Sequence, residues 1–302
     1  MTADVDSHPT RTAALARRFF DRIEPVHAVT YFAAESRSAL DDLGFRGFWA
    51  GYFAARSAPL GRVPAEVVTA VFYNFAPHRV ASALSAAWAV AAPADALRAR
   101  RLGAVAALRR AGVTDDAAGA AADLAHRAAT SADVGGRPLY AANRALPWPD
   151  DPVARLWHAA TLLREHRGDG HVAVLTAHGL SGRESNVLHA AAGRVPEEMI
   201  KRSRDYDDAQ WAAHSDALRR RGLLDGAGAL TDLGDTVKTR IEDATDQLAL
   251  PALDVLDDGE VEALFAALTP ITRAVIAAGD LPAATPMGLR RDDLDDDSAH
   301  LG

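Results

Sequence analysis

Apolar residues recur at helical spacing along most of this chain, and prolines and glycines divide the pattern into separate segments. Leu15, Phe19 and Ile23, for example, lie four residues apart and would share one face of an α-helix. Only residues 222–231 indicate β-structure, because short apolar stretches there flank a glycine-rich turn. We therefore expect a mostly α-helical protein with one short β-hairpin.

The individual helices are expected to begin and end at proline, glycine and capping residues. The first helix is expected to end near Pro25, because proline in a helix interior lacks the N–H group that the helix needs. Thr114 is expected to cap the helix that follows it. The expected helices cover residues 12–23, 35–43, 47–56, 64–75, 78–91, 93–111, 115–129, 153–167, 171–178, 183–192, 207–221, 234–250 and 261–278.

Three prolines mark the strongest break in the chain. Pro147, Pro149 and Pro152 lie close together, and such a run forbids a continuous helix. We place a domain boundary near residues 145–152. The chain is then expected to comprise a disordered tail (1–9), a helical N-terminal domain (10–147), a C-terminal domain (148–283) and an acidic tail (284–302), of which residues 291–297 are expected to be solvated and disordered.

The C-terminal domain is expected to follow a winged-helix order of helix, turn, helix, then helix, hairpin and a long helix. The string Leu218-Arg219-Arg220-Arg221-Gly222-Leu223-Leu224, followed by Leu230-Thr231-Asp232-Leu233-Gly234, resembles the junction of helix, wing and helix in the MarR-type superfamily. The resemblance implies a MarR-like winged-helix lobe in which the hairpin forms the wing.

Three other strings resemble the SalK-type helix-turn-helix proteins of actinobacteria. They are Tyr52-Phe53-Ala54-Ala55-Arg56-Ser57-Ala58-Pro59-Leu60-Gly61, Phe72-Tyr73-Asn74-Phe75-Ala76-Pro77, and the segment from Leu163 to His171. The resemblance spans residues 14–256. It implies a helix-turn-helix fold and supplies no reaction mechanism.

Composition excludes several classes of protein. The 302 residues include no cysteine, so a disulfide, a thiol nucleophile and a cysteine metal site are all excluded. No run of about 18 apolar residues is present, so no membrane span is expected. The first nine residues lack the basic and apolar blocks of a signal peptide, and a cytoplasmic location is expected.

The candidate recognition helix, residues 207–221, is poorly suited to DNA. Asp205, Asp207 and Asp208 lie at its start, where a DNA phosphate would bind. No Arg or Lys lies between Gly222 and Leu230, the expected wing. The net charge of −8 also opposes binding to a phosphate backbone. DNA is therefore not the expected partner, and the winged helix is expected to serve as a scaffold.

The segment from Arg164 to His171 concentrates chemically active residue types in an otherwise alanine-rich chain. Its glycines, Gly168 and Gly170, predict a tight bend between two helices. The remaining members suggest three roles. Arg164 would hold an anion, His166 and His171 would act as acid or base, and Glu165 or Asp169 would orient a histidine or ligate a metal.

Residues of the N-terminal domain are candidate partners for this segment. His27, Tyr31 and Glu35 would share one face if their stretch is helical, and Arg56 is a second candidate for holding an anion. Structural roles remain open for each candidate. Asp169 is equally suited to capping a helix, Arg164 and Glu165 to ion pairs, and the N-terminal residues to a polar seam between helices.

Metal or haem ligation by His166, His171 and His189 is the less favoured interpretation. His166 and His171 are five residues apart, whereas helical zinc ligands are spaced by four. No metal site is therefore predicted, and the sequence indicates no particular cofactor.

These observations predict a small-molecule site between the two lobes. The leading hypothesis is an enzyme of specialised metabolism that binds an anion through arginine and uses histidine acid/base chemistry. The alternatives are a ligand-responsive MarR-like transcriptional regulator and a non-catalytic carrier or self-resistance protein. Residues 261–278 would either form a homodimer contact or pack on the N-terminal lobe of the same chain.

Overall fold

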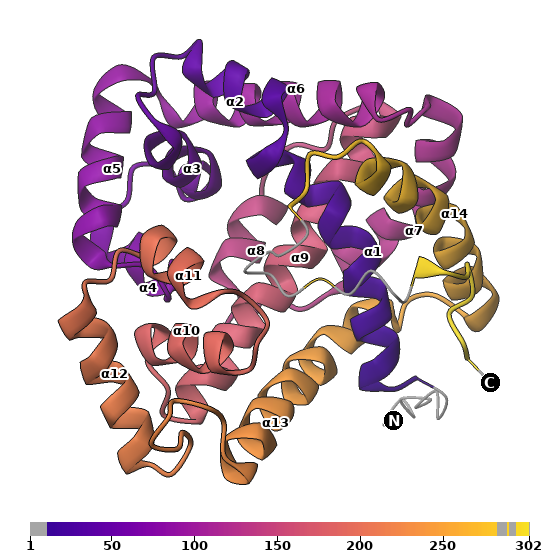
Figure 1. Cartoon of the computed structure of the whole chain (residues 1–302). Helices are drawn as coiled ribbons and strands as arrows, with labels where there is room; N and C mark the ends of the chain where they lie inside the picture. Colours follow the sequence, from indigo (N-terminus) through magenta and orange to yellow (C-terminus); the bar gives the residue numbers. More distant parts are fainter. Residues whose placement is uncertain (1–10, 283–288, 290–293, 302) are drawn as a thin grey trace, which may run out of the picture.

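The computed structural model describes residues 11–282, 289 and 294–301, and its regular structure is helical (Figure 1). The first half contains α1 (Ala13–Phe32), α2 (Ala34–Asp41), α3 (Phe48–Ser57), the 3-10 helix η1 (Ala58–Leu60), α4 (Ala65–Phe72), α5 (Pro77–Val90), α6 (Pro93–Arg110), α7 (Asp115–Ser131) and α8 (Pro138–Arg144). The second half contains α9 (Pro152–Ala177), α10 (Gly182–Ala191), α11 (Glu197–Arg204), α12 (Asp208–Arg220), α13 (Asp232–Ala249), the 3-10 helix η2 (Leu250–Leu253) and α14 (Asp258–Ala277).

The long helix α9 lies at the centre of the fold, where α1, α6, α7, α8 and α13 pack around it. Trp157 on α9 is buried, and its indole Nε1 donates a hydrogen bond to the Thr30 hydroxyl of α1 at 2.9 Å. The main apolar core combines residues of α1 and α7 with residues of α9 and α14. The core therefore joins residues from both sides of the predicted boundary near residue 147, and that boundary stays a prediction.

Helix α1 continues past the proline at which it was expected to end. Pro25 lies inside α1, which reaches Phe32. Glu24 and Val26 on either side are buried, because α1 packs against α9, α13 and α14. Tertiary packing thus overrides the local cost of the missing N–H group.

Helix α9 likewise continues through the expected bend. Gly168 and Gly170 both lie within α9, so the predicted anion-binding loop at this point is wrong. A side chain at Gly170 would overlap the guanidinium of Arg137. That guanidinium donates to the backbone oxygen of His166 and, at 2.9 Å, to that of Leu248. Gly170 therefore makes room for a neighbouring arginine and does not bend the chain.

The expected β-hairpin wing is also wrong, and the described residues contain no β-strand. Only Leu224 and Leu230 form an isolated antiparallel bridge. The Asp225 carboxylate accepts hydrogen bonds from the backbone N–H groups of Ala227 and Ala229, both at 2.9 Å. These bonds close a compact turn between α12 and α13 that is too short for paired strands. The fold is all-α, without a winged helix of the expected kind.

The structure confirms one predicted helix cap and contains two helices that the sequence did not predict. The Thr114 hydroxyl accepts a hydrogen bond from the Ala117 N–H at 3.3 Å, which confirms the predicted cap of α7. Two short helices, α8 and α11, were not expected. Helix α11 ends at Arg204, the next residue, Asp205, adopts the left-handed conformation with φ of 61°, and α12 begins at Asp208.

The C-terminal helix α14 packs on its own chain. Val261, Leu264 and Phe265 are buried in the core, and the Phe265 ring lies 6.0 Å from that of Phe19 on α1. This is the second of the two alternatives that the sequence left open for α14; a homodimer stays a prediction.

The predicted tails lie partly outside the described residues. This applies to residues 1–9 and to most of 284–293. The described segment 294–301 packs on the fold, because Leu294 and Ala299 are buried and the Ala299 N–H donates to Glu262 at 2.8 Å. Residues 294–301 therefore contact the helical body, and the tail boundary near residue 284 stays a prediction.

Among the described helices, none is by itself long and apolar enough to cross a bilayer. Helices α5 and α6 reach that length and composition only when taken together, and they are bent by 96° at the break between them.

Candidate functional site

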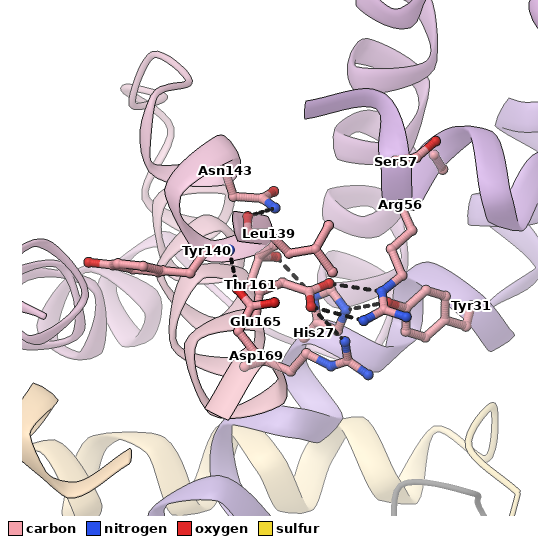
Figure 2. A network of polar contacts seen from close by, with 12 residues as sticks. His27, Tyr31, Arg56, Ser57, Leu139, Tyr140, Asn143, Thr161, Glu165 and Asp169 are labelled. Atoms are coloured by element: carbon pink, nitrogen blue, oxygen red, sulfur yellow. Dashed lines mark hydrogen bonds and ion pairs between the residues drawn. The ribbon is translucent and has the colours of Figure 1, made fainter. Parts of the chain in front are cut away.

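A buried network of ion pairs joins α1, α3 and α9 (Figure 2). Arg56 on α3 binds Glu165 on α9 through two parallel hydrogen bonds, Nε to Oε1 and Nη2 to Oε2, both 3.0 Å long. Arg164 also donates to Glu165 at 3.0 Å, and its Nε lies 3.2 Å from Glu24 on α1. The sequence placed Arg56, Arg164 and Glu165 in one site, and the structure brings these three side chains together.

The arginines decide the charge state of the central carboxylate. Burial alone would raise the pKa of Glu165, but Arg56 and Arg164 outweigh it and hold that pKa well below its usual range. Glu165 is therefore ionised at neutral pH. Burial raises the pKa of Glu24, and the nearby charge of Glu165 acts in the same direction against Arg164.

His27 and Tyr31 form a second buried unit next to this network (Figure 2). The Thr161 hydroxyl donates its proton to the Trp157 carbonyl at 2.8 Å, so it accepts a hydrogen bond from His27 Nδ1 at 2.9 Å. His27 Nε2 is then the acceptor for the Tyr31 hydroxyl at 2.8 Å. Burial lowers the pKa of His27 far below its usual value, so the ring is neutral. His27 thus orients Tyr31.

His166 and Asp169 on α9 both contact Tyr140 of α8. The Asp169 carboxylate accepts a hydrogen bond from the Tyr140 N–H at 2.9 Å, near the start of α8 (Figure 2). Burial raises the pKa of Asp169 to about 7. The His166 ring lies 5.1 Å from that of Tyr140, edge to face, and burial lowers its pKa to about 4. Asp169 therefore binds the first turn of α8, and its expected role as the cap of a helix beginning at His171 is wrong because α9 continues through this point.

His171 faces a different neighbour from His166. The Thr245 hydroxyl donates to the Ile241 carbonyl at 2.7 Å, so His171 Nδ1 donates to that hydroxyl at 2.9 Å. Burial lowers the pKa of His171 to about 4, which leaves the ring neutral with Nε2 as an acceptor. Residues five apart on a helix point about 140° apart, which explains why His166 and His171 do not meet.

A cavity of about 380 Å³ lies beside the ion-pair network. One wall consists of aromatic side chains from α3 and the region of α4, and the opposite wall of residues from α9, α10, α11 and α13. Four of the predicted site residues line it, namely Tyr31, Arg56, Arg164 and His171. Three lining residues have a buried nitrogen atom without a hydrogen-bond partner, namely Arg167, His189 and Arg204. The Arg167 nitrogen still lies 2.7 Å from Asp246 in an ion pair.

The remaining candidates lie outside the cavity lining. Four of them do not line the cavity although they lie on α1 or α9, the helices that carry Tyr31 and Arg164: His27, Glu165, His166 and Asp169. Glu35 lies on α2 in an ion pair with Arg110, partly exposed and away from the cavity. Its expected alignment with His27 and Tyr31 is wrong because α1 ends at Phe32 and the chain turns before α2.

A second cavity of about 440 Å³ lies between α1, α2 and α3. Both cavities touch Tyr31, Phe48 and Tyr52, so these three rings form a shared boundary between them.

Sequence reasoning missed Arg204, because α11 was not expected to be a helix. It considered His189 only as a metal ligand. In the described part of the chain, no three His, Asp or Glu side chains are grouped so that they could hold a metal ion. His166 faces Tyr140 while His171 and His189 line the cavity, so the three histidines do not converge.

A model of a helix-turn-helix family matches residues 16–282. The chain belongs to this family. The match covers the N-terminal helices as well as α10, α11 and α12, so the family unit includes both walls of the cavity. No functionally curated protein and no solved structure gave a significant match to this helix-turn-helix protein.

Proposed function

We propose that this helix-turn-helix protein is a ligand-responsive regulator that binds a small molecule in the 380 Å³ cavity. One observation carries the proposal: the cavity is lined both by residues of α10 and α11 and by aromatic residues of the N-terminal helices. A ligand there would contact Leu188 on α10 and Ile200 on α11 together with Trp49 on α3. It would therefore favour one relative position of these helices over others.

The cavity has the composition of a small-molecule site. Its volume lies within the usual range for such pockets, and its walls combine aromatic rings with a few polar groups. Family membership supports a regulatory function, because helix-turn-helix units are frequent DNA-binding modules.

Acid/base catalysis is less well supported by the geometry. That hypothesis required His166 and His171 to act in one site, whereas only His171 lines the cavity. Tyr31 donates its proton to His27, and burial raises its pKa above the usual value. The cavity therefore offers binding groups more clearly than a catalytic pair.

A second candidate function is a ligand carrier or self-resistance protein that does not bind DNA. It is favoured by the exposed face of α12, which carries two carboxylates, Asp208 and Asp216, against one arginine, Arg220. Arg219 and Arg221 are held by their own chain, the first by Asp216 and the second by the carbonyl groups of His178 and Gly179.

A gel-shift experiment with the DNA upstream of the protein's own gene separates the two candidates. A regulator binds this DNA at low salt, and Arg220→Glu on the exposed face of α12 weakens binding. Arg240→Glu is the matched control, because it reverses the same charge at an exposed position on α13. If DNA binding is absent, or both variants weaken it equally, the regulator is rejected and the carrier is supported.

A further inference from the structure

The cations around the cavity are matched by carboxylates, with one exception. Arg56 is paired with Glu165, and Arg164 with Glu24 and Glu165. Arg167 is paired with Asp246 at 2.7 Å, and Lys238 with Glu242. Arg204 has no carboxylate or hydrogen-bond partner among the described residues, and its Nε is buried.

The surroundings of Arg204 do not compensate its charge. Its guanidinium carbon lies 4.2 Å from the centre of the Phe75 ring. The charged groups that act on it most are Arg56 and Arg79, which are like charges, and Tyr52 and Tyr206 contribute only neutral hydroxyls at physiological pH. The adjacent Asp205 carboxylate is already bound to His78 at 2.6 Å and to Arg79 at 2.8 Å.

An arginine in this position keeps its charge. Burial lowers the pKa of Arg204, but a guanidinium stays protonated in proteins. Arg204 is partly exposed at the cavity, while its Nε is buried without a partner. An anion that enters the site would pair with this cation through charge-assisted hydrogen bonds. The cavity is thus prepared for a negative group at Arg204.

Aromatic rings lie next to this cation. The centres of the Trp49 and Phe75 rings are 5.8 Å apart, and those of Tyr52 and Phe75 are 5.6 Å apart. All three side chains line the cavity together with Phe72. Such walls favour a flat aromatic body over a flexible aliphatic one, because ring faces and edges pack at these separations.

The α13 side of the cavity carries a different polar group. The Nε2 atom of His189 is buried and has no hydrogen-bond partner among the described residues. The charged groups near it are Lys238, Glu242, His171 and Arg194, none of which is a neighbour of Arg204. A hydroxyl or carbonyl group on the ligand would satisfy this nitrogen.

We propose that the cavity binds an aromatic anion, whose charged group pairs with Arg204 and whose ring system lies against Trp49, Tyr52 and Phe75. The inference rests on the proposed ligand site and adds the chemical class of the ligand. It makes Arg204 the residue that determines specificity for a negative group.

Two fluorescent probes of nearly equal shape test the proposal: anilinonaphthalene sulfonate, which is anionic, and N-phenylnaphthylamine, its uncharged analogue. The wild-type protein is titrated with each, and Arg204→Gln and Arg202→Gln are titrated in parallel. Arg202 is the matched control, because it lies on the same helix but is exposed. We expect Arg204→Gln to weaken sulfonate binding about tenfold or more and to change amine binding less than about twofold. Arg202→Gln changes neither.

The outcomes separate this inference from the proposed function. If both probes bind equally and Arg204→Gln alters neither, the ligand site stands and the anion inference is overturned. If neither probe binds the wild-type protein, the ligand site fails and the inference fails with it. If the charge preference appears as expected but the upstream DNA is not bound, the inference stands and the regulator is rejected. Circular dichroism of each variant establishes that it is folded.

Discussion

Arg56 and Glu165 lie 109 residues apart in the sequence and meet in a two-point ion pair, with both N–O distances at 3.0 Å. Their side chains are 11% and 2% exposed, so water screens the pair very little. Arg164 shares the same carboxylate. Glu165 is therefore shared by two arginines on the wall of the cavity, of which only Arg164 has a second carboxylate partner among the described residues, Glu24.

Replacing Glu165 is expected to destabilise the protein strongly. Glu165→Gln leaves Arg56 without its charged partner and leaves Arg164 with Glu24 as its one described carboxylate partner. Loss of one member of a buried ion pair lowers the free energy of unfolding by about 3–5 kcal/mol. Urea unfolding at neutral pH measures the change. Glu35→Gln is the control, because its pair with Arg110 is partly exposed and is expected to contribute less than about 1 kcal/mol. Equal effects at Glu165 and Glu35 would contradict the prediction.

Gly182 at the start of α10 is expected to tolerate no side chain. A Cβ there would overlap the carbonyl group of Tyr73. Tyr73 is itself fixed, because it adopts a φ of 50° and its hydroxyl donates to the Leu180 carbonyl at 2.5 Å. Gly182→Ala is expected to lower the free energy of unfolding by about 1–3 kcal/mol.

Gly119 is the matched control, because a side chain there is expected to stabilise the protein. Nothing lies within 4 Å of a Cβ built on Gly119, in the interior of α7. Gly119→Ala is therefore expected to raise the free energy of unfolding by up to about 1 kcal/mol, since alanine is the better helix former. Thermal melts of the two variants, recorded side by side, give the comparison. A stabilised Gly182→Ala would show that α10 is not held against Tyr73.

The sequence predicted a mostly helical chain and most helix positions, because apolar periodicity is a local signal that survives folding, but the β-hairpin it also predicted is wrong. It failed where tertiary contacts decide the local structure. Pro25 and Gly170 both look like helix breaks in the sequence, yet one is held inside α1 by packing and the other accommodates the Arg137 guanidinium. The helices that pack around Pro25 and the arginine that contacts Gly170 are both distant in the sequence, so the local sequence pattern does not reveal these contacts.

The candidate site shows the same limit. The clustering of polar residues correctly brought Arg56, Arg164 and Glu165 together, because buried charges must find partners. The role assigned to His166 depended on a bend that is absent, and a continuous helix separates it from His171. Arg204 was overlooked because its significance lies in having no partner among the described residues, which only three-dimensional contacts reveal.

The buried histidines are expected to make the protein sensitive to acid. Burial lowers the folded-state pKa of His158 and His189 to about 3, and of His166 and His171 to about 4, from 6.5. Between pH 6.5 and 4 the unfolded chain therefore binds more protons than the folded chain, and stability falls as pH falls. Asp169 acts in the opposite sense, because burial raises its folded pKa from 3.8 to about 7 and the folded state keeps that proton.

Two variants with opposite effects test this balance. His158→Phe removes one buried histidine and is expected to flatten the fall in stability between pH 7 and 5. Asp169→Asn removes the opposing contribution and is expected to steepen it. Each histidine changes the slope by up to about 1.4 kcal/mol per pH unit. Urea unfolding at pH 7, 6 and 5 measures the slopes, and a change of the same sign in both variants would disprove the assignment.

Arg204→Met is expected to stabilise the protein in the absence of ligand. The substitution keeps the apolar stem that packs near Phe75 and removes a charge that no described carboxylate balances. Replacing this partly buried, poorly compensated charge with an apolar side chain is worth up to about 1 kcal/mol, which raises Tm by about 2 °C in a chain of this size. Arg164→Met is the matched control and is expected to lower Tm, because it leaves Glu24 without its partner. Differential scanning calorimetry without added ligand compares the two. A lower Tm for Arg204→Met would show that the fold already balances this charge, and the cavity would then have no need of an anion.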